Sequence, residues 1–366
     1  IKASIESPEL YILYKENLKD QIIKQGEPFE INKFEDERER LFTVFRNNGV
    51  YNFQQNSIQF TASIDSTGKD LKIPINVKIS NIQKRVEDSI IKLPYKKFKI
   101  KDVSIFINNK NQITNLAEYN DSIIYRGFNV FSEGRLKYNP KAITSGITLR
   151  KGKFYSDLDR NLTYRYFTSL KNFKYPNINY TLPEDSDAEL NATILLSPKE
   201  RFSLGFDLDL SHSNIQDFGI GVGGGLGIRN IFHGAELLEI NIKNTLGASR
   251  DISRTGNQFF NIFELGADIK LSVPRLLLPT FKNDLFPASM YPKTEIILGS
   301  SLQENVGLDK QFFKVNYQFD WKPNDKKKMQ FKLIDLEFIN NRNVSNYFNV
   351  YRNSYDRLNT IAKDIS

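Results

Sequence analysis

The sequence predicts two copies of a small α+β unit, followed by the first strands of an antiparallel transmembrane β-barrel. Two observations carry this prediction. Short motifs recur in the first half at an offset of about 125 residues, and from Arg201 onward apolar and polar residues alternate. No apolar run reaches the roughly 18 residues of a transmembrane helix, whereas a barrel strand needs an apolar residue only at every second position.

The composition argues against several kinds of chemistry. The 366 residues include 51 Lys and Arg, 43 Asp and Glu, 2 His and no Cys. The lack of Cys excludes disulfides, thiolate metal sites and cysteine nucleophiles, and two histidines supply little for a metal site or a triad. The net charge of +8 is scattered, which favours ordinary solubility over a nucleic-acid groove. We therefore expect no enzyme activity, no cofactor, no metal and no nucleic-acid partner.

The first unit is predicted at residues 1–80. Its order is strand, helix, helix, strand, strand, with these elements in turn: Ile1–Glu6, Glu9–Lys24, a long helix capped by Asn32 with Glu35 three residues on, and alternating runs from Ile58 and Leu71 around a turn at Ser66–Gly68. The first residues lack a signal-peptide pattern, so we interpret the chain as mature or trimmed at its start.

The second unit is predicted at residues 95–198, after a linker over 81–94. It repeats the order of the first, with Ser156 and Asp159 opening its long helix and strands near Ile178 and Leu190. It also carries an insertion at 108–132, predicted as a hairpin around Arg126–Gly127. Two unrelated α+β domains would give the same pattern.

Residues 199–366 are predicted as the N-terminal part of a transmembrane β-barrel, with about seven strands. The first strand sets apolar residues against polar ones; its apolar face is Phe202, Leu204, Phe206, Leu208 and Leu210. In the second strand one face consists of glycines, namely Gly219, Gly221, Gly223, Gly225 and Gly227. The later strands are Leu238–Ile242, Phe263–Val273, Ile296–Leu302, Phe313–Trp321 and Met329–Ile339, the last with a slip at Leu333–Ile334. An odd count cannot close a barrel of the usual even number, so further strands are expected.

One connection in this region is unusually apolar. Pro274–Pro292 contains the run Leu276–Leu278 and is longer than the short turns expected on the inner side of a barrel. It either lies at the membrane interface, contacts a partner, or is simply an ordered loop.

The turn after the second strand carries a resemblance to a known family. Its sequence, Arg229-Asn230-Ile231-Phe232-His233-Gly234-Ala235-Glu236, resembles the Arg-Asn-Leu-Phe…Gly-x-Glu turn of the bacterial surface-antigen, outer-membrane assembly-factor superfamily, in its BamA/TamA-like branch. The two α+β units resemble the periplasmic POTRA domains of that superfamily. The residues carried over are Arg229, Asn230, Phe232, Gly234 and Glu236. The family's Arg-Gly-Phe lid motif occurs here only as Arg126–Phe128, in the wrong domain, so its role is not carried over.

The resemblance implies a protein that folds and inserts β-barrel proteins in the outer membrane of a Gram-negative bacterium, with its POTRA domains in the periplasm. It implies strand augmentation at a POTRA edge such as Lys174–Leu182, and a lateral gate at the first barrel strand. The implied partners are unfolded outer-membrane β-barrel clients, outer-membrane lipids, and accessory lipoproteins or an inner-membrane bridging protein. The alternative is a polypeptide- or lipid-export pore of the same superfamily, of the two-partner secretion or translocation-module type.

Other interpretations stay open at this point. Gly219–Gly224 matches the dinucleotide-binding pattern G-x-G-x-x-G, but the alternation of a strand continues through it. Asp207 and Asp209 would pass for paired glycosidase carboxylates, or for charges lining a lumen. The glycine file either thins the wall beside the gate or leaves room for a plug. A soluble β-sandwich enzyme or adhesin is the remaining class.

Overall fold

The computed structural model describes residues 1–63, 72–86, 89–108, 116–212, 218–248, 260–278, 286–304, 309–324, 326–342, 344 and 352–365. The chain is mostly β-strand, with few helices. It divides into two compact units. One consists of Ile1–Leu136, Ile147–Phe167 and Tyr175–Ser197, and the other of Lys137–Gly146, Thr168–Lys174 and Pro198–Ser366. The predicted boundaries near residues 80, 95 and 198 stay predictions.

The first sheet of the chain has the order β1-β3-β2. Its elements are β1 (Lys2–Ile5), α1 (Pro8–Glu16), α2 (Ile31–Asn47), β2 (Ile58–Ala62) and β3 (Ile75–Ile79). The strand β1 is parallel to β3, and β2 is antiparallel to it. Leu10, Leu41, Phe45 and Ile79 are fully buried in the core of this sheet and its helices. The first α+β unit therefore follows the predicted order of strand, helix, helix, strand, strand.

Two helix boundaries differ from the prediction. The helix α2 begins at Ile31 after Glu30, whose backbone is extended, so Asn32 lies inside the helix and our N-cap was wrong. The helix α1 ends at Glu16 and not near Lys24, because the Asn17 amide donates back to the Leu13 carbonyl (2.8 Å) and only a short 3-10 turn follows. The predicted turn Ser66–Gly68 and the start of the run at Leu71 lie outside the described residues.

The predicted linker is wrong in one respect, because residues 81–94 contain an antiparallel hairpin. It consists of β4 (Ile82–Val86) and β5 (Ser89–Leu93), which pair only with each other among the described strands. Ile82 packs against the core of the first sheet. The apolar runs of this hairpin are short and are interrupted by Lys and Arg, so the sequence alone did not distinguish them from a linker.

The second sheet has the order β7-β8-β6-β10-β9. Its strands are β6 (Lys99–Ile107), β7 (Asp121–Tyr125), β8 (Phe128–Ser132), β9 (Phe173–Thr181) and β10 (Glu189–Pro198), and α4 (Asp157–Ser169) is its long helix. The predicted hairpin in the insertion is confirmed: Arg126 and Gly127 both have positive φ, as a two-residue primed turn requires. The start of that insertion, 109–115, lies outside the described residues. Ser156 caps α4 as predicted, since its hydroxyl accepts from the Asp159 amide (3.2 Å).

Arg46 joins α2 to the first turn of α4 within one compact unit. Its guanidinium donates to both carboxylate oxygens of Asp157 (2.7 and 2.8 Å) and to the Tyr155 hydroxyl (2.8 Å). Burial alone would raise the pKa of Asp157, but the hydrogen bonds from Arg46 and Tyr155 outweigh it and hold that pKa below its usual range. This planar fork therefore ties together two helices that are more than a hundred residues apart in the sequence.

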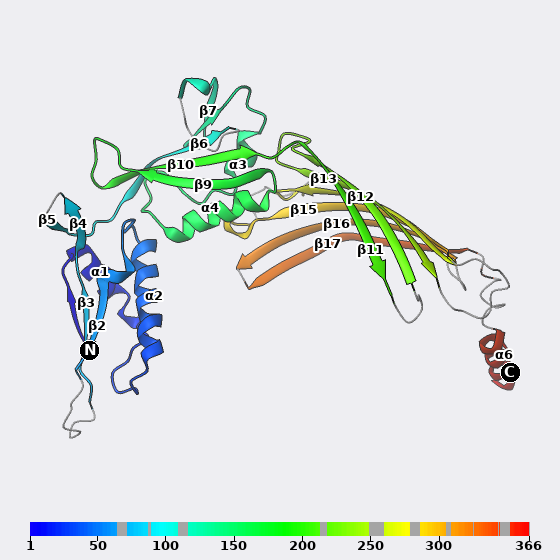
Figure 1. Cartoon of the computed structure of the whole chain (residues 1–366), viewed down its shortest axis with the longest axis horizontal. Coiled ribbons are helices and arrows are strands. Elements are labelled where there is room, and N and C mark those ends of the chain that lie inside the picture. The colour runs from blue at the N-terminus through cyan, green and yellow to red at the C-terminus, as the bar shows by residue number, and fades with distance from the viewer. Residues whose placement is uncertain are drawn as a thin grey trace. The chain divides into compact units, whose positions relative to one another are not determined.

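The other unit is built on a seven-stranded antiparallel sheet in which each strand pairs with its neighbours in the chain (Figure 1). Its strands are β11 (Phe202–Ser211), β12 (Phe218–Arg229), β13 (Leu237–Ala248), β14 (Ile262–Val273), β15 (Lys293–Glu304), β16 (Asp309–Asn324) and β17 (Lys327–Arg342). The unit also contains α3 (Pro140–Thr144) and α6 (Arg352–Ile365). Among the described residues the sheet is not closed, because β11 pairs only with β12 and β17 only with β16.

The predicted slip in the last strand is a β-bulge. Tyr317 pairs with Ile334 and Gln318 with Lys332, so Leu333 has no partner in the register. The helix α6 was not predicted.

Candidate functional site

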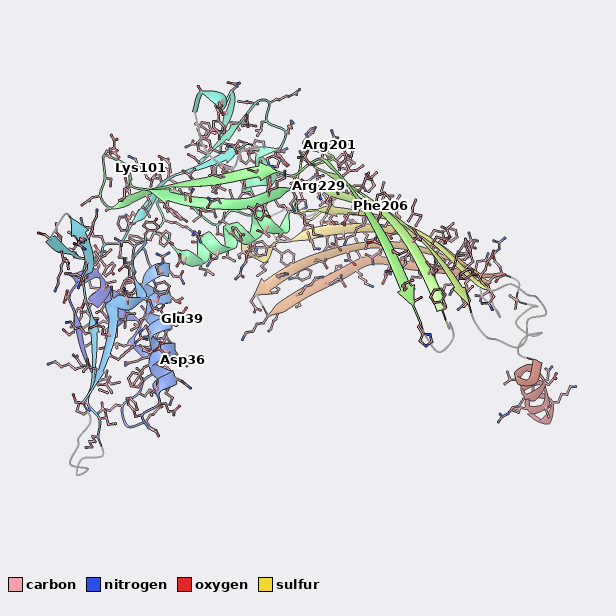
Figure 2. The ribbon with its side chains drawn as sticks, viewed as in Figure 1. Asp36, Glu39, Lys101, Arg201, Phe206 and Arg229 are labelled. Atoms are coloured by element: carbon pink, nitrogen blue, oxygen red, sulfur yellow. The ribbon has the colours of Figure 1, made fainter. Side chains whose placement is uncertain are left out.

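The large sheet has one apolar face, as predicted from the alternation. The register places side chains opposite one another in continuous rows, such as Leu204, Leu226, Ile240, Ile269 and Leu298. On β11 this face is bare: Phe202, Leu204, Phe206, Leu208 and Leu210 are between 59% and 85% exposed. Figure 2 labels Phe206, the most exposed of them, on β11. Such a face is stable only against another apolar medium.

The same strand is an open edge. Ten residue pairs, Phe202 with Ile228 through Ser211 with Gly219, join β11 to β12, and no described strand pairs with its other side. Its outer backbone N–H and C=O groups are thus available to another strand. A free backbone edge is what strand addition requires.

The glycine file faces β11 residue by residue. On the polar face, Ser203 pairs with Gly227, Gly205 with Gly225, Asp207 with Gly223, Asp209 with Gly221 and Ser211 with Gly219. Every cross-strand side-chain pair on this face is therefore missing. Because such pairs contribute about 0.2–1 kcal/mol each, the seam between β11 and β12 depends on its main-chain hydrogen bonds and on the apolar face alone.

The missing side chains also let charges meet across β12. Lys243 Nζ on β13 lies 2.6 Å from Asp209 Oδ2 on β11, although a strand separates them. A Cβ at Gly221 would lie 3.3 Å from the Asp209 Cβ and 3.5 Å from the Lys243 Cε. The glycine thus leaves the space through which this ion pair forms.

The turn from β12 to β13 is tightly wound. Asn230, His233 and Ala235 all have positive φ, a conformation that non-glycine residues adopt at a cost and that surrounding contacts must hold. The Asn230 amide N–H donates to the Glu236 carbonyl (2.7 Å), and the Asn230 side-chain oxygen accepts from the Ala235 N–H (3.0 Å). The Asn230 side chain therefore closes the turn on itself.

The turn also holds two other segments of the same unit. The Asn230 side-chain amide donates to the Lys137 carbonyl (2.8 Å), which also lies 2.9 Å from His233 Nδ1, and the Asn139 N–H donates to the His233 carbonyl (2.6 Å). Asn172, fully buried, donates from its side chain to the Ala235 carbonyl (2.8 Å). We call Arg229–Glu236 with these partners the latch turn. Burial next to it raises the pKa of Tyr138 to about 12, so this hydroxyl stays protonated.

Arg229 fixes the start of β11 to the latch turn. Its guanidinium donates to the carbonyls of Glu200 (2.9 Å) and Lys171 (3.2 Å), and its backbone N–H donates to the Arg201 carbonyl (2.8 Å). Arg201 and Arg229 lie close together at this end of the sheet in Figure 2. The guanidinium thus satisfies two carbonyls, and the backbone N–H of the same residue satisfies a third.

Glu236 is the buried charge of the latch turn. Its side chain is 1% exposed, Oε2 accepts from the N–H groups of Gly234 (2.9 Å) and Phe232 (3.3 Å), and Oε1 lies 3.2 Å from the Arg275 guanidinium. A Cβ at Gly234 would come within 2.1 Å of Oε1, so any larger residue there would displace the Glu236 carboxylate from this position. Phe232, 64% exposed, has no comparable packing. Gly234 and Glu236 of the family-like turn thus meet at one buried carboxylate.

The alternative sites lack the geometry that they need. Gly219–Gly224 lies inside β12, so no helix begins there to receive a pyrophosphate. Asp207 and Asp209 lie on the same polar face of one strand, and Asp209 is paired with Lys243. Within the described ranges, no group of three or more His, Asp or Glu is placed to hold a metal ion. None of the helices described combines the length and apolarity needed to cross a membrane.

The sequence did not reveal the partners of the latch turn. Lys137, Asn139, Asn172 and Arg275 lie between 39 and 92 residues away from it along the chain, and three of them contribute through backbone groups or a single amide. No local pattern marks such residues, because their role depends on the folded path of the chain.

Comparison with known proteins finds similarity only to solved structures. No protein-family model matches the sequence, and no curated protein matches it significantly. Among solved structures the chain is similar to BamA from Haemophilus ducreyi lacking POTRA domains 1–3, with 10% identity and a TM-score of 0.48 over 94% of this chain and 51% of that one. It is similar to CdiB from Acinetobacter baumannii (9%, 0.32, 92% and 62%) and to CdiB from Escherichia coli (7%, 0.32, 92% and 53%). The chain thus spans between 51% and 62% of the length of these structures.

Proposed function

We propose that this chain belongs to an outer-membrane assembly factor that folds and inserts β-barrel proteins through β11. The observation that supports this most directly is the combination found in that one strand: a free backbone edge, a bare apolar face, and a glycine strand behind it. A client strand that adds to β11 would cover its own backbone groups while its apolar side chains meet lipid. Such an activity needs no cofactor and no bond-making chemistry.

The α+β units add a second place for extended clients. The strand β9 is an edge of its sheet, pairing only with β10 among the described strands, and its Tyr175 is 83% exposed. We propose that these units lie in the periplasm of a Gram-negative bacterium and pass client segments toward β11 by pairing with them. Accessory lipoproteins or an inner-membrane bridging protein are further proposed partners.

Site-directed cross-linking tests the role of β11 directly, because the chain contains no cysteine. Ser203→Cys places a thiol on β11, and Ser301→Cys places one on the same polar face of β15, away from the edge. With a client that carries one cysteine in its last strand, we expect disulfide capture at 203 and none at 301. Equal capture at both positions would refute the proposal.

Depletion of the protein in its host then separates assembly from export. Broad loss of barrel proteins from the outer membrane, measured by quantitative proteomics, supports assembly. Loss of one secreted substrate, or of lipid asymmetry, with normal levels of barrel proteins would instead favour the export pore.

A further inference from the structure

The connection between β14 and β15 folds back onto the apolar face of the sheet. Its described residues are Pro274–Leu278 and Phe286–Pro292, which we call the interfacial loop; residues 279–285 lie outside the described part. The Leu277 N–H donates to Thr294 Oγ1 (2.9 Å), and that hydroxyl donates to the Arg275 carbonyl (2.7 Å). The Tyr317 hydroxyl donates to the Leu277 carbonyl.

The register identifies the face to which the loop is bound. Thr294 pairs with Phe319 and Ile296 with Tyr317, and these positions continue the row of Leu298 and Val315 on the apolar face. The charged residues Lys293, Glu295 and Asp320 lie on the opposite face. The loop is therefore anchored to the side of the sheet that faces away from the polar residues.

The loop covers one end of that face and leaves the rest open. Phe319 is 4% exposed beneath it, whereas Phe313 and Phe331 on the same face are 42% and 53% exposed. The Phe286 ring lies 4.7 Å from the ring of Trp321, and Leu276 is 5% exposed. At this end of β15 and β16, the interfacial loop therefore covers the apolar face that elsewhere on the sheet is exposed.

The described residues of the loop are themselves mostly apolar. Its twelve described residues include one charge, Arg275, which is paired with Glu236. Leu277, Leu278 and Met290 are half-buried, so part of each side chain reaches solvent. The turn from β16 to β17, at the same end of the sheet, is the opposite in character, with Lys326, Lys327 and Lys328 in its sequence. The apolar composition of the interfacial loop is unusual for a segment that faces only water.

We propose that the interfacial loop binds the bilayer surface, with Leu277 and Leu278 at the boundary between headgroups and acyl chains. The inference rests on the proposed function in one respect, that the apolar face of the sheet meets lipid. Three features favour lipid over a protein partner: the loop continues a lipid-compatible face, its described residues offer no unpaired charge, and it lies beside Tyr317 and Trp321, residue types that concentrate at membrane interfaces. Acyl chains would then contact β15 and β16 only on the side of Thr294 and Phe319 that leads toward Leu298 and Val315.

Fluorescence quenching tests this placement, since Trp321 is the single tryptophan of the chain. In a Trp321→Phe background, Leu277→Trp reports on the loop and Phe206→Trp on the middle of the bare face of β11. The full-length protein, with any tryptophan outside these 366 residues replaced by phenylalanine, is reconstituted in phosphatidylcholine vesicles with bromines near the top or near the end of the acyl chains. We expect the indole at 277 to be quenched at least two-fold more by shallow than by deep bromines, and the indole at 206 to show the reverse preference.

Two outcomes would overturn the inference. An indole at 277 that iodide quenches like a free one, and that neither lipid quenches, would place the loop in water. An indole at 277 that neither lipid nor iodide quenches would place it under protein. In both cases, quenching of the indole at 206 by lipid would still show that the apolar face of the sheet meets the membrane. If lipid did not quench the indole at 206, both that premise and the placement of the loop would be wrong. Native Trp321 provides the second measurement: Phe286→Ala should raise its quenching by shallow bromines, and an unchanged value would contradict the proposed position.

Discussion

Filling one glycine of β12 should hold β11 more firmly in the sheet. Gly223 pairs with Asp207, and a Cβ at Gly223 would lie 3.5 Å from the Asp207 Cβ, which is ordinary van der Waals contact. Gly223→Ala therefore adds a cross-strand contact without displacing a neighbour. Gly227 is unsuitable for this purpose, because a Cβ there would come within 2.5 Å of Ser203 Oγ.

The size of the effect follows from what changes when β11 separates. The strand β12 stays paired with β13, so the backbone entropy of residue 223 does not enter. Only the new contact counts, and it contributes about 0.2–1 kcal/mol. The population of molecules in which β11 has separated should fall by a factor of about 1.4–5.

Hydrogen exchange of the β11 amides, read by mass spectrometry on the reconstituted protein, measures this population. Gly266→Ala is the matched control, because Gly266 lies on the same polar face of β14, has similar free space (nearest atom 3.8 Å), and does not face β11. We expect slower exchange in β11 for Gly223→Ala and no change for Gly266→Ala. Equal exchange in the two variants would refute the argument that missing side chains weaken this seam.

Three further predictions concern the latch turn and the contact of Arg46 with Asp157, which joins α2 to α4. Arg275→Ala should lower the free energy of unfolding by about 2–3 kcal/mol, because it leaves the Glu236 carboxylate buried without its counter-charge; adding Glu236→Gln should restore part of this loss in thermal denaturation, and no restoration would argue against the charge as the cause. Arg46→Lys should cost about 1–2 kcal/mol, since lysine cannot make the fork to Asp157; Arg38→Lys, whose partner Glu35 is exposed, should change unfolding by less than about 0.5 kcal/mol, and equal losses would contradict the role of the fork. The lowered pKa of Asp157 means that its contribution is complete above about pH 5 and is lost as the pH falls through that pKa, so Asp157→Asn should flatten the acid side of the stability profile, and an unchanged profile would exclude this carboxyl.

The strands of the large sheet were predictable because their information is local. Alternation with a period of two assigns each residue to a face regardless of its partners, and even the bulge at Leu333 appears as a break in that period. The hairpin turn at Arg126–Gly127 was predictable for a similar reason, since its neighbours alternate on both sides.

The contacts that organise the site were not predictable in this way. The glycine file was visible in the sequence, but its alignment with Asp207 and Asp209 depends on the length of the connection between β11 and β12. The link from Lys243 to Asp209 crosses a whole strand, and the latch turn draws partners from three separate segments. The leucine run allowed three interpretations, namely a segment at the membrane interface, a contact with a partner, or an ordered loop. None of them specified the path of Pro274–Leu278 over the apolar face, because hydrophobicity alone does not say which surface a segment covers.

The latch turn holds one end of β11, whereas the glycine file faces this strand along its whole length, so the two ends of β11 are held unequally. The start of β11 is fixed by the Arg229 N–H on the Arg201 carbonyl and by the Arg229 guanidinium on the Glu200 carbonyl. Beyond that anchor, every polar-face position of β11 from Ser203 to Ser211 faces a glycine, and the farthest ion pair, between Asp209 and Lys243, is more than half exposed on both sides and therefore contributes little. The strand β11 should therefore move away from β12 less near Phe202 than near Leu210, because the latch turn restrains only the Phe202 end, and hydrogen exchange of the β11 amides should show this gradient.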